Sequence, residues 1–303
     1  DLVVYADFRP AMILVQNANT GKFSRLTATS GILEGLLSST RPGSLMQVQL
    51  GDEDDGASVM AVKEKFARVF YIDEKQNVVV EKQYNGRNSA ARLTDAAIGS
   101  LRENNGKETV ILDRGNKILT VYGEGEQEAP SDALAHVELD DTTYNALRLF
   151  DLDGDGQDDV ILTADDRVSV VFSRPLYGAL QTVASASTPV EDGGFGKVYT
   201  ANLVDTPERE IIGIEMKENM MEIFLSGRDE EKRPALLRFY KFKMFDVEAA
   251  LARRQSLDAP AQPRELIAVD INDDGRNELA TLTHDNLILY YPQEKEAEEG
   301  EED

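Results

Sequence analysis

Cysteine and tryptophan are both missing from this 303-residue sequence, and histidine occurs only twice. Without cysteine there can be no disulfide framework, thiol nucleophile or thiolate metal site. His136 and His284 stand far apart in the sequence and neither has a spaced metal or nucleophile partner, so we expect no histidine-based catalytic site. The lack of tryptophan removes the strongest stacking platform for a sugar ring, although Tyr and Phe can substitute for it.

Basic residues are few compared with acidic ones: 32 Lys and Arg stand against 56 Asp and Glu, which gives a formal net charge of −24. This charge repels nucleic acid and anionic lipid and attracts metal cations, so we expect no nucleic-acid partner. No apolar run approaches the roughly 20 residues of a membrane helix, and we expect no membrane insertion. The common acyl-transfer and nucleotide-binding phrases are absent as well, so the sequence does not predict an enzyme.

What the sequence does contain is a repeat. The phrase NALRLFDLDGDGQDDVILTADDRVSVVFS around Asp151 recurs as ELIAVDINDDGRNELATLTHDNLILYYPQ around Asp270. Each copy reads as a strand, an acidic loop, a second strand, a tight turn and a third strand, because short apolar stretches alternate with acidic and Gly- or Asn-containing turns. Four weaker copies keep the turn-separated strand pair and lose parts of the acidic loop.

The residue that ends each acidic loop serves as a reference point for the repeat. These reference residues are Asp1, Ser58, Thr109, Asp159, Glu210 and Glu278, at spacings of 57, 51, 50, 51 and 68 residues. A unit of about fifty residues with up to four short strands suits a β-propeller blade, since each small sheet buries its faces only on its neighbours. We therefore predict an all-β fold, a β-propeller of about six blades with seven as the alternative count. An open β-sandwich with coincidental acidic turns is the competing interpretation.

Two segments differ from the rest of the predicted propeller, which spans residues 1–293. The longest spacing contains FDVEAALARRQS, in which Asp246 can cap a short helix, so a helical insertion is expected at about residues 245–256. Residues 294–303, EKEAEEGEED, are predicted to form an acidic, solvated tail.

The two intact acidic loops have the composition of calcium sites. In DLDGDGQDD the aspartates alternate along the chain and Gly156 permits a tight turn, a spacing that wraps hard oxygens around Ca2+ at about 2.3–2.6 Å. The predicted ligands of this loop are Asp151, Asp153, Asp155, the backbone carbonyl of Gln157, and Asp159. The second loop, DINDDGRNE, keeps an oxygen at each of these positions: Asp270, Asn272, Asp274, the carbonyl of Arg276, and Glu278.

Two alternatives for these loops can be weighed on the sequence. An EF-hand starts with the same phrase, but it needs a bidentate Glu at position twelve and flanking helices. Position twelve is Leu162 in one loop and Thr281 in the other, both in strand-like sequence, so the EF-hand is excluded. The other alternative is an acidic turn that binds nothing, in which five aspartates within nine residues would repel one another without a cation.

The D-x-D-x-D-G-x-x-D phrase resembles the loops of the FG-GAP/VCBS repeat propellers, whose blades are related to those of integrin α-subunit heads. The resemblance implies that each such loop joins the first two strands of a blade and binds Ca2+, which carries over onto residues 151–159 and 270–278. Phe195-Gly196 stands where the family has its FG pair, without the GAP triplet. In that unit Val204, Thr206 and Pro207 replace metal-loop residues, so a structural role is expected there.

Two classes of function follow. The first is a non-catalytic, calcium-binding scaffold for protein recognition, adhesion or assembly. The second is a carbohydrate-active propeller, which would be either a lectin or a glycosidase or lyase that uses dispersed Asp, Tyr and Arg residues. A glycan is therefore the alternative ligand. The N-terminal DLVVYADF suggests a processed chain, which together with calcium predicts an extracellular or periplasmic location. Since Asp1 matches a loop's last residue, we also expect a protein partner or an upstream segment to complete the first blade beside Leu2.

Overall fold

The computed structural model describes residues 2–6, 9–16, 20–26, 35–37, 45–48, 58–73, 77–102, 106–123, 132–173, 183–204, 206–231, 234–244, 265–282 and 286–291. In these ranges the regular structure is almost entirely β, as predicted, with strands β1 to β22 following one another along the chain. No helix in the described part of the chain is long and apolar enough to cross a membrane.

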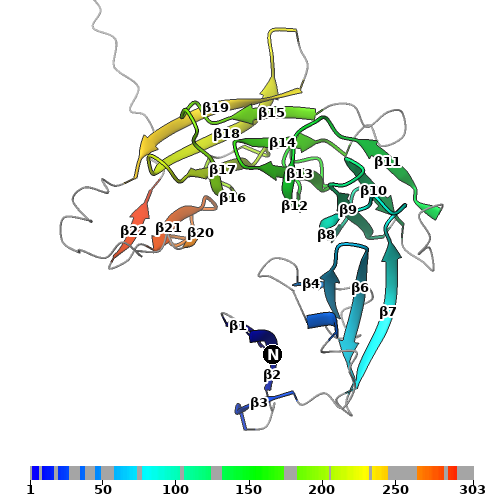
Figure 1. Cartoon of the computed structure of the whole chain (residues 1–303). Helices are drawn as coiled ribbons and strands as arrows, with labels where there is room; N and C mark the ends of the chain where they lie inside the picture. The colour runs from blue at the N-terminus through cyan, green and yellow to red at the C-terminus, as the bar shows by residue number, and fades with distance from the viewer. Residues whose placement is uncertain are drawn as a thin grey trace, which may run out of the picture. The chain divides into compact units, whose positions relative to one another are not determined.

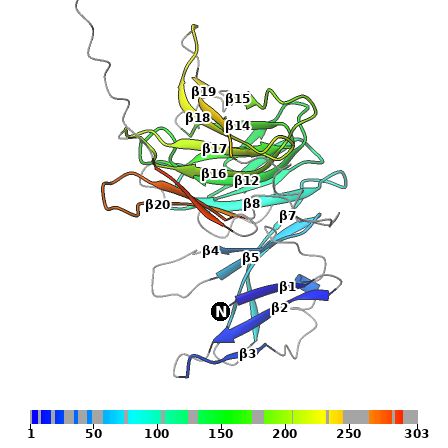
Figure 2. The ribbon, with the colours of Figure 1, turned by 90° about the vertical axis from the view of Figure 1, so that its left-hand side faces the viewer.

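The strands that the structure describes form six sheets, and in each sheet the neighbours in space are also neighbours in sequence (Figure 1). Sheet 1 contains β1 (Leu2–Ala6), β2 (Arg9–Gln16) and β3 (Phe23–Arg25), which Figure 2 shows side by side. Sheet 2 contains β4 (Leu45–Val48), β5 (Ser58–Val62), β6 (Phe66–Ile72) and β7 (Val78–Asn85). Sheet 3 contains β8 (Leu93–Gly99), β9 (Glu108–Asp113), β10 (Ile118–Tyr122) and β11 (Ala135–Glu138).

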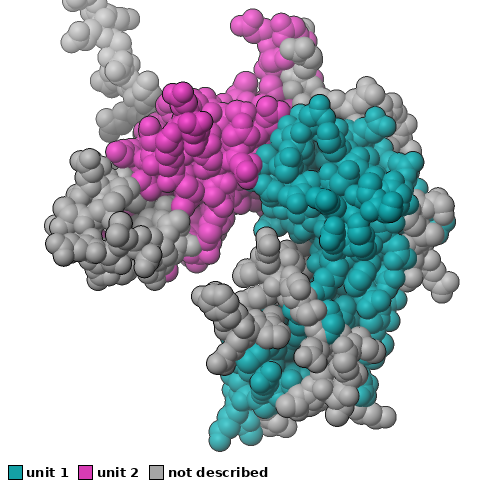
Figure 3. Space-filling model, viewed as in Figure 1, with its two compact units in different colours: residues 1–149, 160–164, 171–181 teal, residues 150–159, 165–170, 182–303 magenta. Residues whose placement is uncertain are grey.

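The remaining three sheets follow the same pattern. Sheet 4 contains β12 (Tyr144–Phe150), β13 (Asp159–Ala164), β14 (Arg167–Val171) and β15 (Val183–Ser187). Sheet 5 contains β16 (Phe195–Ala201), β17 (Glu210–Glu215), β18 (Met220–Arg228) and β19 (Pro234–Lys243). Sheet 6 contains β20 (Glu265–Val269), β21 (Glu278–Leu282) and β22 (Leu287–Tyr290). The chain divides into two compact units (Figure 3): unit 1 is 1–149, 160–164 and 171–181, and unit 2 is 150–159, 165–170 and 182–303.

The sequence repeat coincides with the sheets, with one shift. Four of the reference residues, Ser58, Asp159, Glu210 and Glu278, each begin the second strand of a sheet. In sheet 3 the second strand, β9, begins at Glu108, one residue before Thr109. Asp1, the helical insertion expected at 245–256 and the tail at 294–303 lie outside the described residues. Leu162 and Thr281 lie in strands β13 and β21, which confirms that neither acidic loop is an EF-hand.

Each second strand gives its sheet two faces, since successive residues of a strand point to opposite sides. We count positions from the reference residue of each sheet: Asp1, Ser58, Glu108, Asp159, Glu210 and Glu278. The face that carries residues two and four positions after the reference residue is called the leading face. The face that carries residues one and three positions after it is called the trailing face.

In unit 1, the leading face of one sheet packs on the trailing face of the next. Val110 and Leu112, from the leading face of sheet 3, share a buried cluster with Val160 and Leu162, from the trailing face of sheet 4. Sheets 2 and 3 meet in the same way, because Met60 and Val62, from the leading face of sheet 2, share a buried cluster with Ile111, from the trailing face of sheet 3. Sheets 1 and 2 meet through a cluster that includes Ile13, from the leading face of sheet 1, and Ala61, from the trailing face of sheet 2. Burial of these apolar side chains, at about 25 cal/mol per Å² removed from water, is the main force that holds the sheets of this unit together.

Unit 2 shows the same relation between its last two sheets. Ile212 and Ile214 lie on the leading face of sheet 5 and are fully buried. They share a cluster with Leu266 and Leu279, from the trailing face of sheet 6. Within each unit, therefore, sheets stack in one direction along the chain, leading face onto trailing face.

Candidate metal centre

The loop at residues 151–159 connects β12 to β13 and is folded around the carboxylate of Asp151. Its Oδ1 accepts the backbone N–H of Asp155 at 3.1 Å, and its Oδ2 accepts the N–H of Gly156 at 2.9 Å. Gly154 and Gly156 have φ values of 74° and 83°, which glycine adopts without strain. A Cβ on Gly154 would also lie 2.6 Å from the carbonyl oxygen of Pro207, so this position has room only for glycine.

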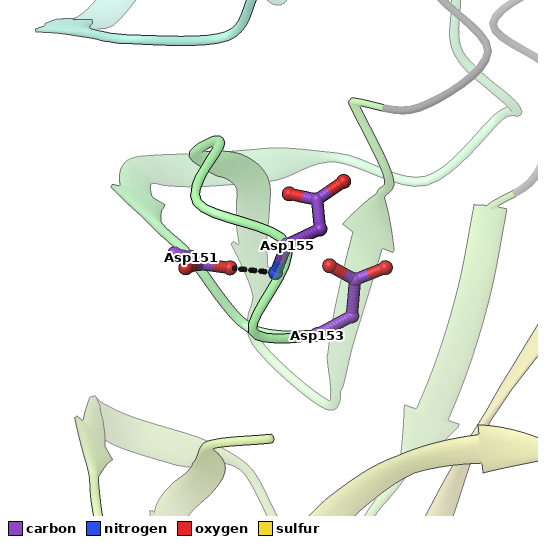
Figure 4. A group of neighbouring side chains, drawn as sticks. All are labelled: Asp151, Asp153 and Asp155. Atoms are coloured by element: carbon purple, nitrogen blue, oxygen red, sulfur yellow. Dashed lines mark hydrogen bonds between the residues drawn. The ribbon is translucent and has the colours of Figure 1, made fainter. Parts of the chain in front are cut away.

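Three carboxylates converge in this loop. One side-chain oxygen from each of Asp151, Asp153 and Asp155 lies within 4.8 Å of the others, and all three residues are half-buried (Figure 4). Two unit charges 4 Å apart repel each other by about 4 kcal/mol at an effective dielectric constant near 20. Hard, anionic oxygens from alternate residues are the donors that Ca2+ prefers, so this group fits a calcium ion.

The other two predicted ligands of this loop have different surroundings. Gln157 donates its backbone N–H to Asp155 Oδ1 at 2.9 Å, and its side-chain amide contacts Asp155 Oδ2 at 3.3 Å. Asp159 is 1% exposed, and its Oδ2 accepts the backbone N–H of Leu152 at 3.1 Å. The carboxylate group within 4.8 Å does not include Asp159. The structure thus brings three of the predicted ligands together and places Asp159 at the base of the loop.

The loop at residues 270–278 has the same backbone geometry. Asp270 accepts the N–H of Asp274 at 3.2 Å and that of Gly275 at 2.8 Å, the bonds that Asp151 makes in the first loop. Its two positive φ angles, 60° at Asp273 and 86° at Gly275, fall at the positions of Gly154 and Gly156. Aspartate tolerates this left-handed conformation better than most residues, which explains how Asp273 replaces a glycine.

The side chains of this second loop differ in charge. Asn272 replaces an aspartate, and its side-chain amide donates to Asp274 Oδ2 at 3.1 Å. Arg276 pairs with the same oxygen at 3.1 Å. The backbone N–H of Arg276, followed by its guanidinium, lowers the pKa of Asp274. The sequence predicted Arg276 as a carbonyl ligand only; the structure shows that its side chain brings a positive charge to a predicted calcium ligand.

A buried acid closes four loops, including two that lack the aspartate series. Each acid begins a second strand and accepts the backbone N–H of the residue seven positions earlier. The four donor–acceptor pairs are Leu101–Glu108 at 3.0 Å, Leu152–Asp159 at 3.1 Å, Leu203–Glu210 at 2.6 Å and Ile271–Glu278 at 2.7 Å. Asp159 and Glu278 therefore hold the loop backbone, a role that sequence reasoning missed. The recurrence of an acid at the first residue of the second strand is the signal that could have revealed it.

Three consecutive loops of unit 2 are joined by backbone hydrogen bonds. Arg209, in loop 202–210, donates its N–H to the carbonyl of Leu152 at 2.9 Å. Asn277, in loop 270–278, donates its N–H to the carbonyl of Asn202 at 2.5 Å. Asn202 returns its own N–H to the Asn277 side chain at 2.8 Å. The loop without the aspartate series thus lies between the two predicted calcium loops and bonds to both.

The remaining sequence predictions about chemistry have these outcomes. His136 lies on β11, where its Nδ1 is 3.3 Å from the hydroxyl of Thr120, and His284 lies outside the described residues.

A hollow in unit 1 is lined by Arg87, Asn88, Asn116, Lys117, Ile118, Glu138 and Leu139. Its lining contains one carboxylate and no aromatic ring, so it does not have the aromatic and acidic character expected of a sugar site.

Comparison with known proteins places the fold. No family model and no curated protein matches the sequence. Two solved structures are similar to this chain. One is a chain of an active polycomb repressive complex 2 in the basal state, with a TM-score of 0.51 and 8% sequence identity. The other is a chain of the Chaetomium thermophilum polycomb repressive complex 2 bound to GSK126, with a TM-score of 0.50 and 9% identity. The likeness covers 82% of this chain and 48% and 50% of those chains, so this chain spans about half of their length. At such low identity the likeness shows the fold alone, which is of the β-propeller type.

Proposed function

We propose that this chain is a calcium-stabilised β-propeller of the FG-GAP/VCBS type that acts as a protein-interaction scaffold and not as an enzyme. The convergence of Asp151, Asp153 and Asp155 carries the calcium part of the proposal. The scaffold part is supported by the fold, since the similar chains were solved as parts of a multi-protein complex. On this proposal the six sheets are six blades of one propeller, and the acidic loops join the first and second strands of two of them.

The two loops are proposed to bind calcium with different affinity. In loop 151–159 the three aspartates would hold the ion, whose charge offsets their mutual repulsion. In loop 270–278 Asn272 replaces the middle aspartate of the alternating series, so that series keeps only the carboxylates of Asp270 and Asp274, and Arg276 competes for Asp274. Because affinity for Ca2+ rises with the number of anionic ligands, we expect the first loop to bind more tightly.

A structural calcium of this kind suits an extracellular or periplasmic protein. Extracellular modules commonly bind calcium at about 10⁻⁴ to 10⁻³ M, where the ion is plentiful. An anionic surface with a net charge of −24 also favours cationic or metal ligands over nucleic acid.

A partner strand is proposed to pair with β1. In sheet 1, β1 pairs with β2, and none of the strands that the structure describes pairs with the other edge of β1. In sheets 2 to 6 the corresponding second strand has a neighbour on both sides. An unpaired edge exposes a row of backbone donors and acceptors that an extended segment of another protein can satisfy.

Native mass spectrometry tests the calcium proposal. The chain should carry one calcium ion at low free calcium and a second ion at higher concentration, and a chelator should remove both. Asp153→Asn should abolish the first binding event, whereas Asp166→Asn, in the turn between β13 and β14, should leave it unchanged. Equal occupancy in the wild type and the Asp153 variant would remove loop 151–159 from the proposal.

A further inference from the structure

The first predicted calcium loop touches loop 202–210 at two points, both within unit 2. Arg209 donates its backbone N–H to the carbonyl of Leu152 at 2.9 Å. A Cβ on Gly154 would lie 2.6 Å from the carbonyl oxygen of Pro207, so the two backbones are in close contact there. Leu152 and Gly154 alternate along the chain with the three converging aspartates. Each contact point therefore stands between two predicted calcium ligands.

The second predicted calcium loop meets the other side of loop 202–210 in the same way. The carbonyl of Asn202 accepts the N–H of Asn277 at 2.5 Å, and Asn202 returns its own N–H to the side chain of Asn277 at 2.8 Å. The side-chain amide of Asn202 donates to the carbonyl of Gly275 at 2.6 Å. Gly275 and Asn277 alternate with the predicted ligands of their loop, so each of them also stands between two ligands.

The closing acid Glu210 ties the two sides of loop 202–210 together. Its Oε2 accepts the N–H of Leu203 at 2.6 Å, and the side chain is fully buried. Leu203 follows Asn202 in the chain and Glu210 follows Arg209, so this bond connects the residues that reach the two calcium loops. Covalent and hydrogen bonds thus form one continuous path from one calcium loop to the other.

We propose that loop 202–210 couples the two calcium sites, so that an ion in either calcium loop raises the affinity of the other loop for calcium. This inference rests on the proposed calcium function. An ion held by the residues on both sides of a contact point fixes the backbone at that point. The first ion therefore orders backbone that the second ion would otherwise have to order, and the second ion binds at a lower entropic cost. The coupling is reciprocal, because each ion changes the affinity for the other by the same factor.

Calorimetric calcium titration of the wild type and of two one-site variants measures this coupling factor. Asp153→Asn leaves only the second site and Asp274→Asn leaves only the first, so these variants give the affinity of each site alone. For independent sites, the product of these two affinities equals the product of the two stepwise affinities of the wild type. We expect the wild-type product to be larger by at least about fivefold.

Two substitutions weaken the link without removing a predicted ligand. Asn202→Ala removes the donor to Gly275, and Asn277→Ala removes the acceptor of the Asn202 N–H. Each should lower the coupling factor, and the two together should reduce it to about one. The affinity of the first site, measured in the Asp274→Asn background, should stay unchanged. Asn85→Ala, at an exposed asparagine of unit 1, is the control and should keep the full factor.

Hydrogen exchange measured by mass spectrometry gives a second readout. In Asp274→Asn, calcium binds only at loop 151–159, yet it should slow exchange in the peptides that contain Asn202 and Asn277. Addition of Asn202→Ala should remove this distant protection and keep the protection at loop 151–159. Circular dichroism checks that each variant is folded.

The outcomes separate the coupling from the proposed function. Two bound ions with a factor of about one or less, and protection confined to loop 151–159, would overturn the coupling and leave the calcium function intact. A factor that the substitutions at Asn202 and Asn277 do not change would show that loop 202–210 is not the link. A wild type that binds a single ion would overturn the coupling, and one that binds none would overturn the proposed function as well.

Discussion

The carboxylate of Asp95 accepts the backbone N–H of Leu147 at 2.8 Å, although the two residues stand 52 positions apart in the chain. Asp95 lies on β8 and Leu147 on β12, so this bond joins sheets 3 and 4 within unit 1. The same oxygen contacts the guanidinium of Arg148 at 3.3 Å. Burial, partly offset by these donors, raises the pKa of Asp95 to about 6.

The raised pKa of Asp95 predicts a specific pH dependence of stability. Since the folded-state pKa lies above the ordinary value of 3.8, the folded chain binds this proton more tightly than the unfolded chain. The resulting stabilisation is present below pH 3.8 and is lost as the pH rises to about 6. At about 1.4 kcal/mol per pKa unit, the loss amounts to about 3 kcal/mol. Denaturant unfolding of the wild type and of Asp95→Asn should show the difference between their unfolding free energies falling by this order between these pH values. A difference independent of pH would contradict the assignment.

Calcium should stabilise the fold through loop 151–159. An ion present at one hundred times its dissociation constant adds about 2.7 kcal/mol to the free energy of unfolding for one site. Asp155→Ala should therefore lose most of the rise in melting temperature that calcium produces in the wild type, measured by scanning calorimetry with calcium and with a chelator. Asp166→Ala serves as the control and should respond as the wild type does. An unchanged calcium response in the Asp155 variant would show that this aspartate is not a ligand.

Removal of the Arg276 side chain should tighten calcium binding at loop 270–278. The guanidinium competes with the ion for Asp274, and exposed ion pairs of this kind are weak, so Arg276→Ala should increase the calcium affinity only modestly, by up to about fivefold. Calorimetric calcium titration of the variant checks this, with Arg114→Ala in unit 1 as the matched control. If Arg276→Ala weakens binding, the side chain assists the site and the competition argument is wrong.

The acid that closes a loop should stabilise it without any metal. Glu210 is fully buried, and its Oε2 accepts the N–H of Leu203, which would have no acceptor in Glu210→Ala. An unsatisfied buried N–H costs about 1–3 kcal/mol, so the alanine variant should unfold at lower denaturant concentration. Burial raises the pKa of Glu210, so the neutral Glu210→Gln should lose much less stability. Glu218→Ala, at an exposed turn, is the control. Equal losses for the alanine and glutamine variants would argue against the hydrogen bond as the cause.

The sequence was sufficient to predict the all-β class and the strand that follows each acidic loop, because alternating apolar residues and turn residues encode both locally. It did not distinguish Thr109 from Glu108 as the start of β9, since both fit a strand and the choice depends on which side chain reaches the N–H of Leu101. For the same reason the backbone role of Asp159 could not be separated from metal ligation. The spacing of carboxylates along a chain predicts an ion, while their orientation depends on hydrogen bonds that only the folded loop reveals.

The side chain of Arg276 and the faces of sheet 6 escaped prediction for another reason. A loop motif treats Arg276 as a backbone carbonyl, so the motif contains no information on where the guanidinium goes. Alternation in β20 and β21 indicates two faces, but both faces of sheet 6 carry apolar residues. Which face of sheet 6 is covered depends on the packing of the preceding sheet against it. The sequence of one strand contains no information on that packing.

In four loops a buried acid holds the loop backbone, and this acid is a different residue from the aspartates that alternate along the two predicted calcium loops. The four acids are Glu108, Asp159, Glu210 and Glu278. Loop 202–210 lacks the aspartate series, yet Glu210 accepts the N–H of Leu203 and the loop bonds to the loops on either side. Loop closure and ion binding therefore depend on different residues, so one can be changed without the other. A designer could use the same tolerance to install a calcium site in a loop that has none, by changing surface residues and leaving the closing acid in place.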